Sequence, residues 1–289
     1  MNKLMYMVLL LCLSVSLAGA DKRKEKNIEG NSVQRAASEY EKLLKGKKMK
    51  QVQGLMTLHL VDGKLFVELP LELLKKDMML ASVVSEISEH TDCYVGKNAY
   101  IPLRVYFSKI GKHVQLRRDR NQSIAGGGDI NIARAIERSN TGAIMASFEI
   151  KAYSPDSTAV VFDMTKFFTG SERLISAIDP RSESKLMLKG VNYRLVDDLS
   201  VLEDVKAFEN NVSVQSRLTY NSKVNIYNRY TTAVVTRTLA LLPEVQMKPR
   251  LADYRLPLQV LGKWNYRGNG EILAPVYYAL RWRLEPQNE

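Results

Sequence analysis

The chain has 289 residues, a hydrophobic content of 45% and a formal net charge of +11 at pH 7. This composition is typical of a globular protein and excludes a largely disordered chain. The length allows one large domain or two modest ones, with enough chain to bury a sizeable core.

Residues 1–20 have the pattern of an export signal. Lys3 supplies a positive charge, Leu4–Leu17 forms an apolar run, and Ala18–Ala20 is a small-residue cleavage site. The run is shorter than the roughly 18 residues of a membrane-spanning helix, and no later run is long enough. We therefore expect cleavage after Ala20 and an exported protein, periplasmic or extracellular. The mature chain keeps only Cys93, so it cannot form an intrachain disulfide.

Residues 21–49 predict a basic linker that contains a short helix. Apolar residues fall at helical spacing within Ser32–Leu44, and a lysine cluster follows. A basic segment next to an export signal is usually a solvated linker, and contact with an acidic membrane surface is the alternative. Nucleic-acid binding is not expected, because these basic residues are not interleaved with stacking aromatic side chains.

Residues 50–88 predict a small leading β-hairpin domain. Asp62-Gly63 is a strong two-residue turn signal, because both central positions of such a turn need a positive φ. Folding the chain about this turn places one apolar row on a single face: Met56, Leu58 and Leu60 opposite Leu69, Val67 and Leu65. His59 then lies beside Phe66 on the more polar face. A helical turn over Pro70–Leu74 and a central strand over Met78–Ile87 complete this segment.

Residues 89–272 predict the main β-rich domain, and residues 273–289 predict a connector. A polar loop over Glu89–Asn98 leads to a hairpin that turns near Ile110-Gly111, with Phe107 opposite Val114. Asp129 is placed to cap a helix that contains Ile132. The further predicted elements are a helical turn over Met164–Thr169 and strands over Ala143–Tyr153, Thr158–Asp163, Val191–Leu195, Val212–Tyr220 and Thr232–Leu242.

The hairpins follow one another without a recurring βαβ pattern. The predicted fold class is therefore mainly β (α+β), with antiparallel hairpins that form a sandwich-like or two-sheet domain with a few short helices.

The candidate site residues are few, and each has a simpler structural interpretation. His59, His90 and His113 are far apart in sequence and lie in predicted strands or loops, so they predict no metal site. Cys93 is expected to be a half-exposed structural thiol; the alternative is a nucleophile assisted by His90. The glycine run Gly126–Gly128 lacks the Gly-Lys-Ser/Thr ending of a phosphate loop and predicts a flexible surface loop.

The aromatic residues near the end of the chain are a further candidate. Trp264, Tyr266 and Trp282 can stack on sugars if they are exposed, whereas aromatic residues of β proteins are mostly core. From all these residues we predict no catalytic, cofactor-binding or metal-binding residue, and no cofactor.

Several segments together carry a family resemblance. They are Leu69–Leu74, Met78–Leu80, Ala135–Ser139, Ser147–Ile150, Phe162–Thr165, Val205–Val212, Met247–Asp253 and Arg281–Pro286. In this order they resemble two adjacent domains of unknown function that precede the catalytic domain in secreted bacterial zinc-dependent metalloproteases. That family's chemistry needs a His-Glu-x-x-His helix, which holds Zn²⁺ and activates water. The chain contains no such motif, so no catalytic residue can be transferred to it.

The resemblance implies an exported, non-catalytic N-terminal module with a scaffold, folding or substrate-docking role. Its expected partners are a protease catalytic domain or a peptide substrate. Glu289 lies about where the family's catalytic domain would begin. Two alternatives stay open: a truncated fragment of a longer zinc metalloprotease, and a stand-alone envelope protein that binds a peptide or a glycan. The sequence does not determine the oligomeric state.

Overall fold

The computed structural model describes residues 39–44, 49–90, 93–98, 101–119, 122–178, 193–224, 227–267 and 274–281. The predicted export signal and most of the predicted basic linker lie outside these ranges, as does Trp282. Within them the chain is mainly β, as predicted, with large antiparallel sheets and few helices.

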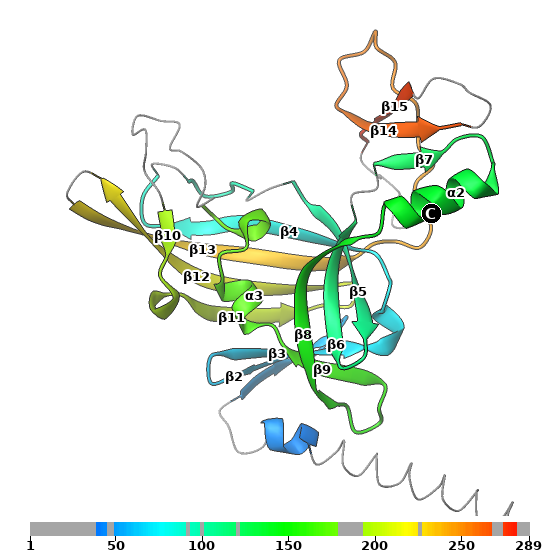
Figure 1. Cartoon of the computed structure of the whole chain (residues 1–289). Helices are drawn as coiled ribbons and strands as arrows, with labels where there is room; N and C mark the ends of the chain where they lie inside the picture. The colour runs from blue at the N-terminus through cyan, green and yellow to red at the C-terminus, as the bar shows by residue number, and fades with distance from the viewer. Residues whose placement is uncertain are drawn as a thin grey trace, which may run out of the picture.

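Most strands join one 12-stranded sheet (Figure 1). Its neighbour order is β1-β2-β3-β9-β8-β6-β5-β4-β13-β12-β10, and β11 also pairs with β12. The strands are β1 (Met49–Val52), β2 (Thr57–Val61), β3 (Lys64–Pro70), β4 (Met78–Ile87), β5 (Leu103–Ile110), β6 (His113–Asp119), β8 (Ala143–Tyr153), β9 (Ala159–Asp163), β10 (Tyr193–Leu195), β11 (Val201–Ala207), β12 (Asn211–Val224) and β13 (Tyr227–Leu241). Strands β1 to β4, from the predicted leading segment, thus share a sheet with the rest.

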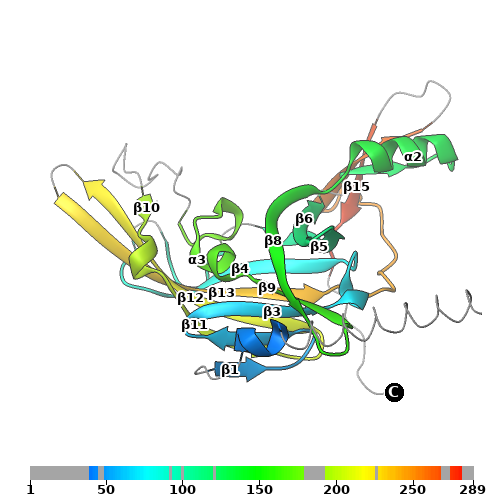
Figure 2. The ribbon, with the colours of Figure 1, turned by 60° about the horizontal axis from the view of Figure 1, so that its bottom comes forward.

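The sheet curls into a near-barrel rather than the predicted sandwich or pair of sheets (Figures 1 and 2). Its first strands return to β11: the Leu55 N–H donates to the Phe208 carbonyl at 2.7 Å, and Lys50 forms an ion pair with Asp204. Because strands twist, a sheet this wide curls on itself and encloses a core without a second layer. That twist accumulates over many strands and is not visible in any single hairpin.

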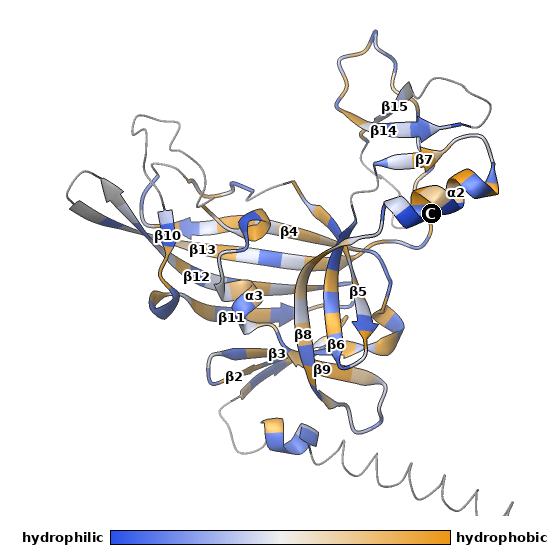
Figure 3. Ribbon diagram, in the orientation of Figure 1, coloured by the Kyte–Doolittle hydropathy of each residue, from blue (hydrophilic) through white to orange (hydrophobic). Residues whose placement is uncertain are grey.

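The main core lies inside the curled sheet. It contains apolar residues from β2, β3, β4, β5, β6, β8, β9, β11, β12 and β13, and Phe167 and Phe168 of α3 (Thr165–Thr169). Four phenylalanine rings meet there. Phe148 stacks on Phe162 with ring centroids 5.3 Å apart. The Phe107 ring lies 6.0 Å from Phe162, and the Phe167 ring lies 6.0 Å from Phe148. Figure 3 shows apolar and polar residues alternating along these strands, as expected when one face of a sheet is buried.

The first hairpin has the predicted register. Leu58 pairs with Val67 and Leu60 pairs with Leu65, about a turn at Asp62-Gly63 in which both residues have positive φ. The helical turn η1 (Leu71–Leu73) follows, and β4 has the predicted bounds and lies between β5 and β13. Here turn chemistry and burial specify the same pairing.

The second face of this hairpin is buried, contrary to the prediction that it is the more polar one. His59 is 0% exposed, and Phe66 is buried beside it. Residues 39–44 form a helix that covers this face with Tyr40, Leu43 and Leu44. The Tyr40 hydroxyl donates to Glu68 Oε2 at 2.8 Å, and His59 Nε2 lies 2.9 Å from the same oxygen. The predicted tethering helix thus lies on the sheet, which a local pattern cannot reveal.

Tyr40→Phe is expected to loosen the 39–44 helix and to cost about 1 kcal/mol of its docking free energy, because one partly buried hydrogen bond is lost. Burial first, and then Glu68, raises the pKa of Tyr40 above its ordinary value of 10.0. This contribution is therefore full below pH 10 and is lost as the pH rises through the higher folded-state pKa. Hydrogen exchange of residues 39–44 measures the effect. Tyr94→Phe, at a 61% exposed tyrosine, is the control and should change nothing.

The second hairpin turns one residue later than predicted. Phe107 pairs with Leu116 and Ile110 pairs with His113, so the central turn residues are Gly111 and Lys112. Gly111 has φ +55 and occupies the first central position, where a type II′ turn requires glycine. The shift changes each partner by two residues, so the predicted core face is kept.

Other predictions are confirmed with small changes of length. Asp129 caps α2 (Ile130–Ser139) by accepting from the Asn131 N–H at 2.8 Å, and β8 and β9 lie where they were predicted. The short helices η2 (Arg173–Ile175) and η3 (Asp197–Leu199) were not predicted. Neither was β11, nor the strands β7 (Ser123–Ala125), β14 (Val260–Tyr266) and β15 (Ala274–Ala279).

Candidate functional site

A separate three-stranded sheet stands apart from the near-barrel (Figure 1). Strand β14 lies in the middle, antiparallel to β15 and parallel to β7. The Ala252 N–H donates to the Tyr277 carbonyl, so residues 250–252 run along the outer side of β15. Helix α2 directly follows β7 and lies beside it. The sheet therefore joins residues 123–125 to the C-terminal part of the chain.

This small sheet has no hydrophobic core of its own within the described ranges. In β7, β14, β15 and α2, Asn265 is the only described residue that is buried. The large apolar residues of this part of the chain are exposed instead. They include Val245, Leu251, Tyr254, Leu256, Leu258, Val260, Leu261, Trp264, Tyr266, Tyr277 and Leu280. Where such exposed apolar residues form one patch, the patch is a candidate surface for another molecule.

Strand pairing places the aromatic side chains on one face of the sheet. Tyr277 lies opposite Gly262, and Trp264 and Tyr266 follow Gly262 at alternate positions of β14. Gly262 leaves room for the Tyr277 ring, which would lie 3.3 Å from a Cβ at that position. Val260 shares this side. We call these four side chains the aromatic face; they are 39–51% exposed.

The opposite face points toward the near-barrel. Lys263 lies there near Arg104 and Asp119, and burial first, then Arg104, lowers the pKa of its ammonium group. Asn265 is packed against Gly126, where a Cβ would lie 1.9 Å from Asn265 Oδ1. Lys263 and Asn265 are therefore less exposed than the aromatic face, although Leu261 at the start of the same side is 49% exposed. We take the aromatic face as the side that is open to a partner.

The sheet also carries an excess of positive charge. Residues 250–267 and 274–281 contain Arg250, Arg255, Lys263, Arg267 and Arg281, whereas Asp253 is their only acid. Asp253 is already paired with Arg255, and Arg281 donates to the Lys248 carbonyl at 2.6 Å. Tryptophan, tyrosine and arginine are the residues that dominate binding energy in protein–protein interfaces, where lysine and acids are depleted. The surface thus has the chemistry of a protein-docking site.

The structure separates the three histidines. His59 is buried and His90 and His113 are exposed, His113 at the start of β6. Among the described residues there is no group of three or more His, Cys, Asp or Glu that could hold a metal ion. The Nδ1 atom of His59 has no hydrogen-bond partner in the described part of the chain, and its ring lies between Glu68 and Tyr40.

Cys93 is buried, contrary to the prediction of a half-exposed thiol. It is 1% exposed, and its Sγ donates to the Ala177 carbonyl at 3.5 Å. Strand β4 and residues 177–178 cover it, a long-range contact that the local polar sequence does not indicate.

The remaining candidates lie in or near the small sheet. Trp264 and Tyr266 are exposed, whereas Trp282 lies outside the described residues. The glycine run is on the surface, but it is held in place: the Gly126 N–H donates to the Tyr266 carbonyl at 2.9 Å. The sequence signal for this site was the aromatic and arginine content near the chain end. Because the pairing of β7, β14 and β15 was not predicted, the sequence did not show that these residues share one face.

Comparisons with known proteins give two family matches. The family model described as domain of unknown function DUF5117 matches residues 100–287, and the model of DUF5118 matches residues 37–87. Comparison with curated proteins found no match, and comparison with solved structures also found none. In the described ranges no helix is both long and apolar enough to cross a membrane.

Proposed function

Since this chain belongs to the DUF5117 family and a DUF5118 segment precedes that domain, we propose that it is an exported, non-catalytic module of a zinc metalloprotease-family protein. Its role is that of a scaffold, and its aromatic face docks the peptidase catalytic domain. The proposal rests on the family resemblance of the sequence and on one structural observation: a sheet without a core that exposes Trp264, Tyr266 and Tyr277.

A folded protein partner explains the aromatic face better than permanent exposure of its rings to water does. An isolated three-stranded sheet gains stability only when one of its faces is packed against another surface. On the inward face Lys263 lies near Arg104 and Asp119 of the near-barrel and Asn265 packs against Gly126 beside β7, whereas the outward face has its aromatic rings in water. The excess of arginine favours a partner surface with acidic groups.

The first test is to read the gene beyond the Glu289 codon and to combine the chain with the peptidase domain encoded there. We expect an open frame that reaches a His-Glu-x-x-His helix, and protection of residues 260–266 and 274–279 from hydrogen exchange on mixing. The double variant Trp264→Ser/Tyr277→Ser should weaken this binding by about tenfold or more, because it removes both large anchors.

Tyr230→Ser is the matched control, since Tyr230 is 55% exposed on β13, outside the small sheet. It should leave the binding unchanged. A stop codon directly after Glu289, or zinc-dependent peptide cleavage by the purified chain that a chelator abolishes, would contradict the proposal.

A second candidate function is glycan binding, and the exposure of Trp264 and Tyr266 favours it. Aromatic rings on a flat sheet face can stack on sugar rings without a deep pocket. Titration with a panel of soluble oligosaccharides, followed by tryptophan fluorescence, tests it. The chain has two tryptophans, so Trp264→Phe identifies the signal. Saturable quenching that this variant removes supports glycan binding.

A further inference from the structure

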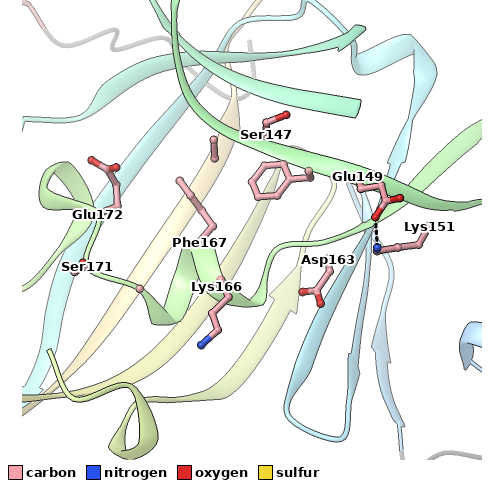
Figure 4. Close-up of a pocket in the computed structure, with 11 residues that line it drawn as sticks. Ser147, Glu149, Lys151, Asp163, Lys166, Phe167, Ser171 and Glu172 are labelled. Carbon is pink, nitrogen blue, oxygen red and sulfur yellow. Dashed lines mark hydrogen bonds and ion pairs between the residues drawn. The ribbon is translucent and has the colours of Figure 1, made fainter. Parts of the chain in front are cut away.

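A second surface lies between β8 and α3, where part of β8 has no neighbouring strand on one side among the described residues. A groove with a volume of about 580 Å³ opens there (Figure 4). Ser147 and Glu149 of β8 lie on one wall, Lys166 and Ser171, of α3 and the turn after it, lie on the other, and Phe148 and Phe167 lie between them at the floor. We call it the β8–α3 groove.

No described strand pairs with one edge of β8 along this groove. On one side β8 pairs with β6 from Ala143 to Glu149, but on the other side β9 pairs only with residues from Ile150 onward. The chain leaves the sheet after Asp163, whose Oδ1 accepts from the Thr165 N–H at 2.8 Å and starts α3. The Thr165 hydroxyl in turn accepts from the Leu65 N–H at 2.8 Å. These bonds turn the chain away from β8, so no described strand covers that edge.

The direction of the free backbone groups follows from the pairing. The Ile150 N–H donates to the Lys112 carbonyl at 2.9 Å, on the β6 side. In an antiparallel pair the backbone groups of successive residues point to alternate sides. The N–H and C=O of Ser147 therefore point away from β6, into the groove. Ser147 is exposed, and no described α3 residue bonds to its backbone.

The floor of the groove is aromatic and rigid. The rings of Phe148 and Phe167 meet edge to face, with centroids 6.0 Å apart, and each residue is 8% exposed. Phe148 also stacks on Phe162. Gly170 ends α3 close to its own last turn, since a Cβ there would lie 2.4 Å from the Lys166 carbonyl oxygen. These contacts hold the two walls apart, so the groove is preformed.

The rim carries charges of both signs. Glu149 forms an ion pair with Lys151, and the hydrogen bond from Lys151 is the main cause that lowers the pKa of the Glu149 carboxyl. Asp163, Lys166 and Glu172 complete the rim. Three carboxylates disfavour a phosphate-bearing ligand, whereas mixed charges accept a peptide of either sign.

We propose that the β8–α3 groove binds an extended peptide, which adds as a strand to the β8 edge that no described strand covers. Unpaired backbone N–H and C=O groups on a strand edge match the spacing and direction of another polypeptide backbone. Alternate side chains of the peptide point to the Phe148–Phe167 floor, so an apolar residue is favoured there. This inference does not depend on what covers the aromatic face of the small sheet.

The experiment uses end-blocked hexapeptides of alternating valine and threonine with a lysine at each end. A matched analogue carries N-methyl groups on alternate amides, which removes the donors of one peptide edge and keeps every side chain. We expect saturable binding of the parent peptide, protection of the Ser147 amide from hydrogen exchange, and loss of binding for the methylated analogue.

Variants of the groove separate backbone pairing from side-chain contacts. Ser147→Pro removes the free N–H and should lower the affinity by about tenfold or more, whereas Ser147→Ala keeps the N–H and should bind as the parent chain does. Ser171→Trp fills the groove from its exposed wall and should also abolish binding, without a change in the core. It keeps the test decisive if Ser147→Pro fails to fold.

Three results would contradict strand addition at β8. No binding of the parent peptide up to about 1 mM, equal binding of the methylated analogue, or unchanged binding in the Ser147→Pro and Ser171→Trp variants would each overturn the proposal. The Trp264→Ser/Tyr277→Ser variant should bind the peptides normally. Failure of the aromatic face to dock a peptidase domain would therefore leave this result intact, and the reverse also holds.

Discussion

Arg237→Ala is expected to lower the free energy of unfolding by about 3–5 kcal/mol, because buried backbone carbonyls lose a charged donor and a cavity forms. Arg237 lies on β13 and is 1% exposed. Its Nε donates to the Ile175 carbonyl at 2.9 Å and its Nη1 to the Phe168 carbonyl at 2.7 Å. Truncation leaves the Phe168 carbonyl without its donor, leaves the Ile175 carbonyl with only the Ser82 hydroxyl at 2.8 Å, and opens a cavity under residues 168–175.

No described acidic side chain pairs with this guanidinium. Burial lowers the pKa of Arg237 to about 10, so the group is still charged at neutral pH. Nη2 has no hydrogen-bond partner in the described ranges, and Ser216 accepts from Nη1 at 3.2 Å. Backbone carbonyls thus stabilise the charge, one of them at the C-terminal end of α3, where a cation is favoured. Arg237 fastens the α3–η2 segment to the sheet.

Urea unfolding measures this effect, and two further variants locate its cause. Arg237→Met keeps much of the side-chain volume and removes the buried charge, so its loss should be smaller than that of alanine. Arg217→Ala removes an arginine that is 41% exposed and paired with Glu203, and should cost at most about 1 kcal/mol. An Arg237→Ala protein as stable as the Arg217→Ala protein would contradict the role of Arg237.

Gly54→Ala is expected to open the seam that nearly closes the barrel, at a cost of about 2–3 kcal/mol. A Cβ at residue 54 would lie 2.4 Å from the Phe208 carbonyl oxygen and 2.6 Å from the Phe208 nitrogen. Both are backbone atoms, which cannot move aside as a flexible side chain does. The neighbouring bond from the Leu55 N–H to the Phe208 carbonyl should be lost with this displacement.

Amide exchange at Leu55, together with urea unfolding, measures the opening of the seam. Gly96→Ala is not a suitable control, because Gly96 has φ +84 and the substitution is strained there. Lys50→Ala is suitable: it removes the Lys50–Asp204 ion pair at the same seam, but introduces no clash, and should cost at most about 1 kcal/mol. Equal exchange rates at Leu55 in the wild-type and Gly54→Ala proteins would contradict the proposed contact.

Gly54 lies in the DUF5118 match and Phe208 in the DUF5117 match, so this seam joins the two family segments.

Local sequence signals predicted the elements that local physics controls. The Asp62-Gly63 turn and the alternation around it were enough to place β2 and β3 in register, and Asp129 was enough to start α2. Strand β8 was found because its side chains alternate over 11 residues. In each case the residues that decide the structure are neighbours in the sequence.

Short strands whose partners are distant were missed. Strand β7 has three residues and pairs with β14, about 140 positions later in the chain. Strands β14 and β15 are largely exposed, so they lack the apolar alternation by which half-buried strands are recognised. Trp264 and Tyr266 were therefore identified from the sequence, but their position on one face of a sheet was not predicted.

The sequence by itself determined the β-rich class, the two hairpins and the core side of each, because turn chemistry and a two-residue period are local properties. Only the tertiary structure decided that His59 and Cys93 are buried, that Arg237 is held by backbone carbonyls, and that no described strand covers the β8 edge beside α3. Each of these depends on which distant segment covers a residue, or leaves it uncovered. Long-range packing makes that choice, as the 39–44 helix does over His59 and residues 177–178 do over Cys93, and no local stretch of the sequence contains it.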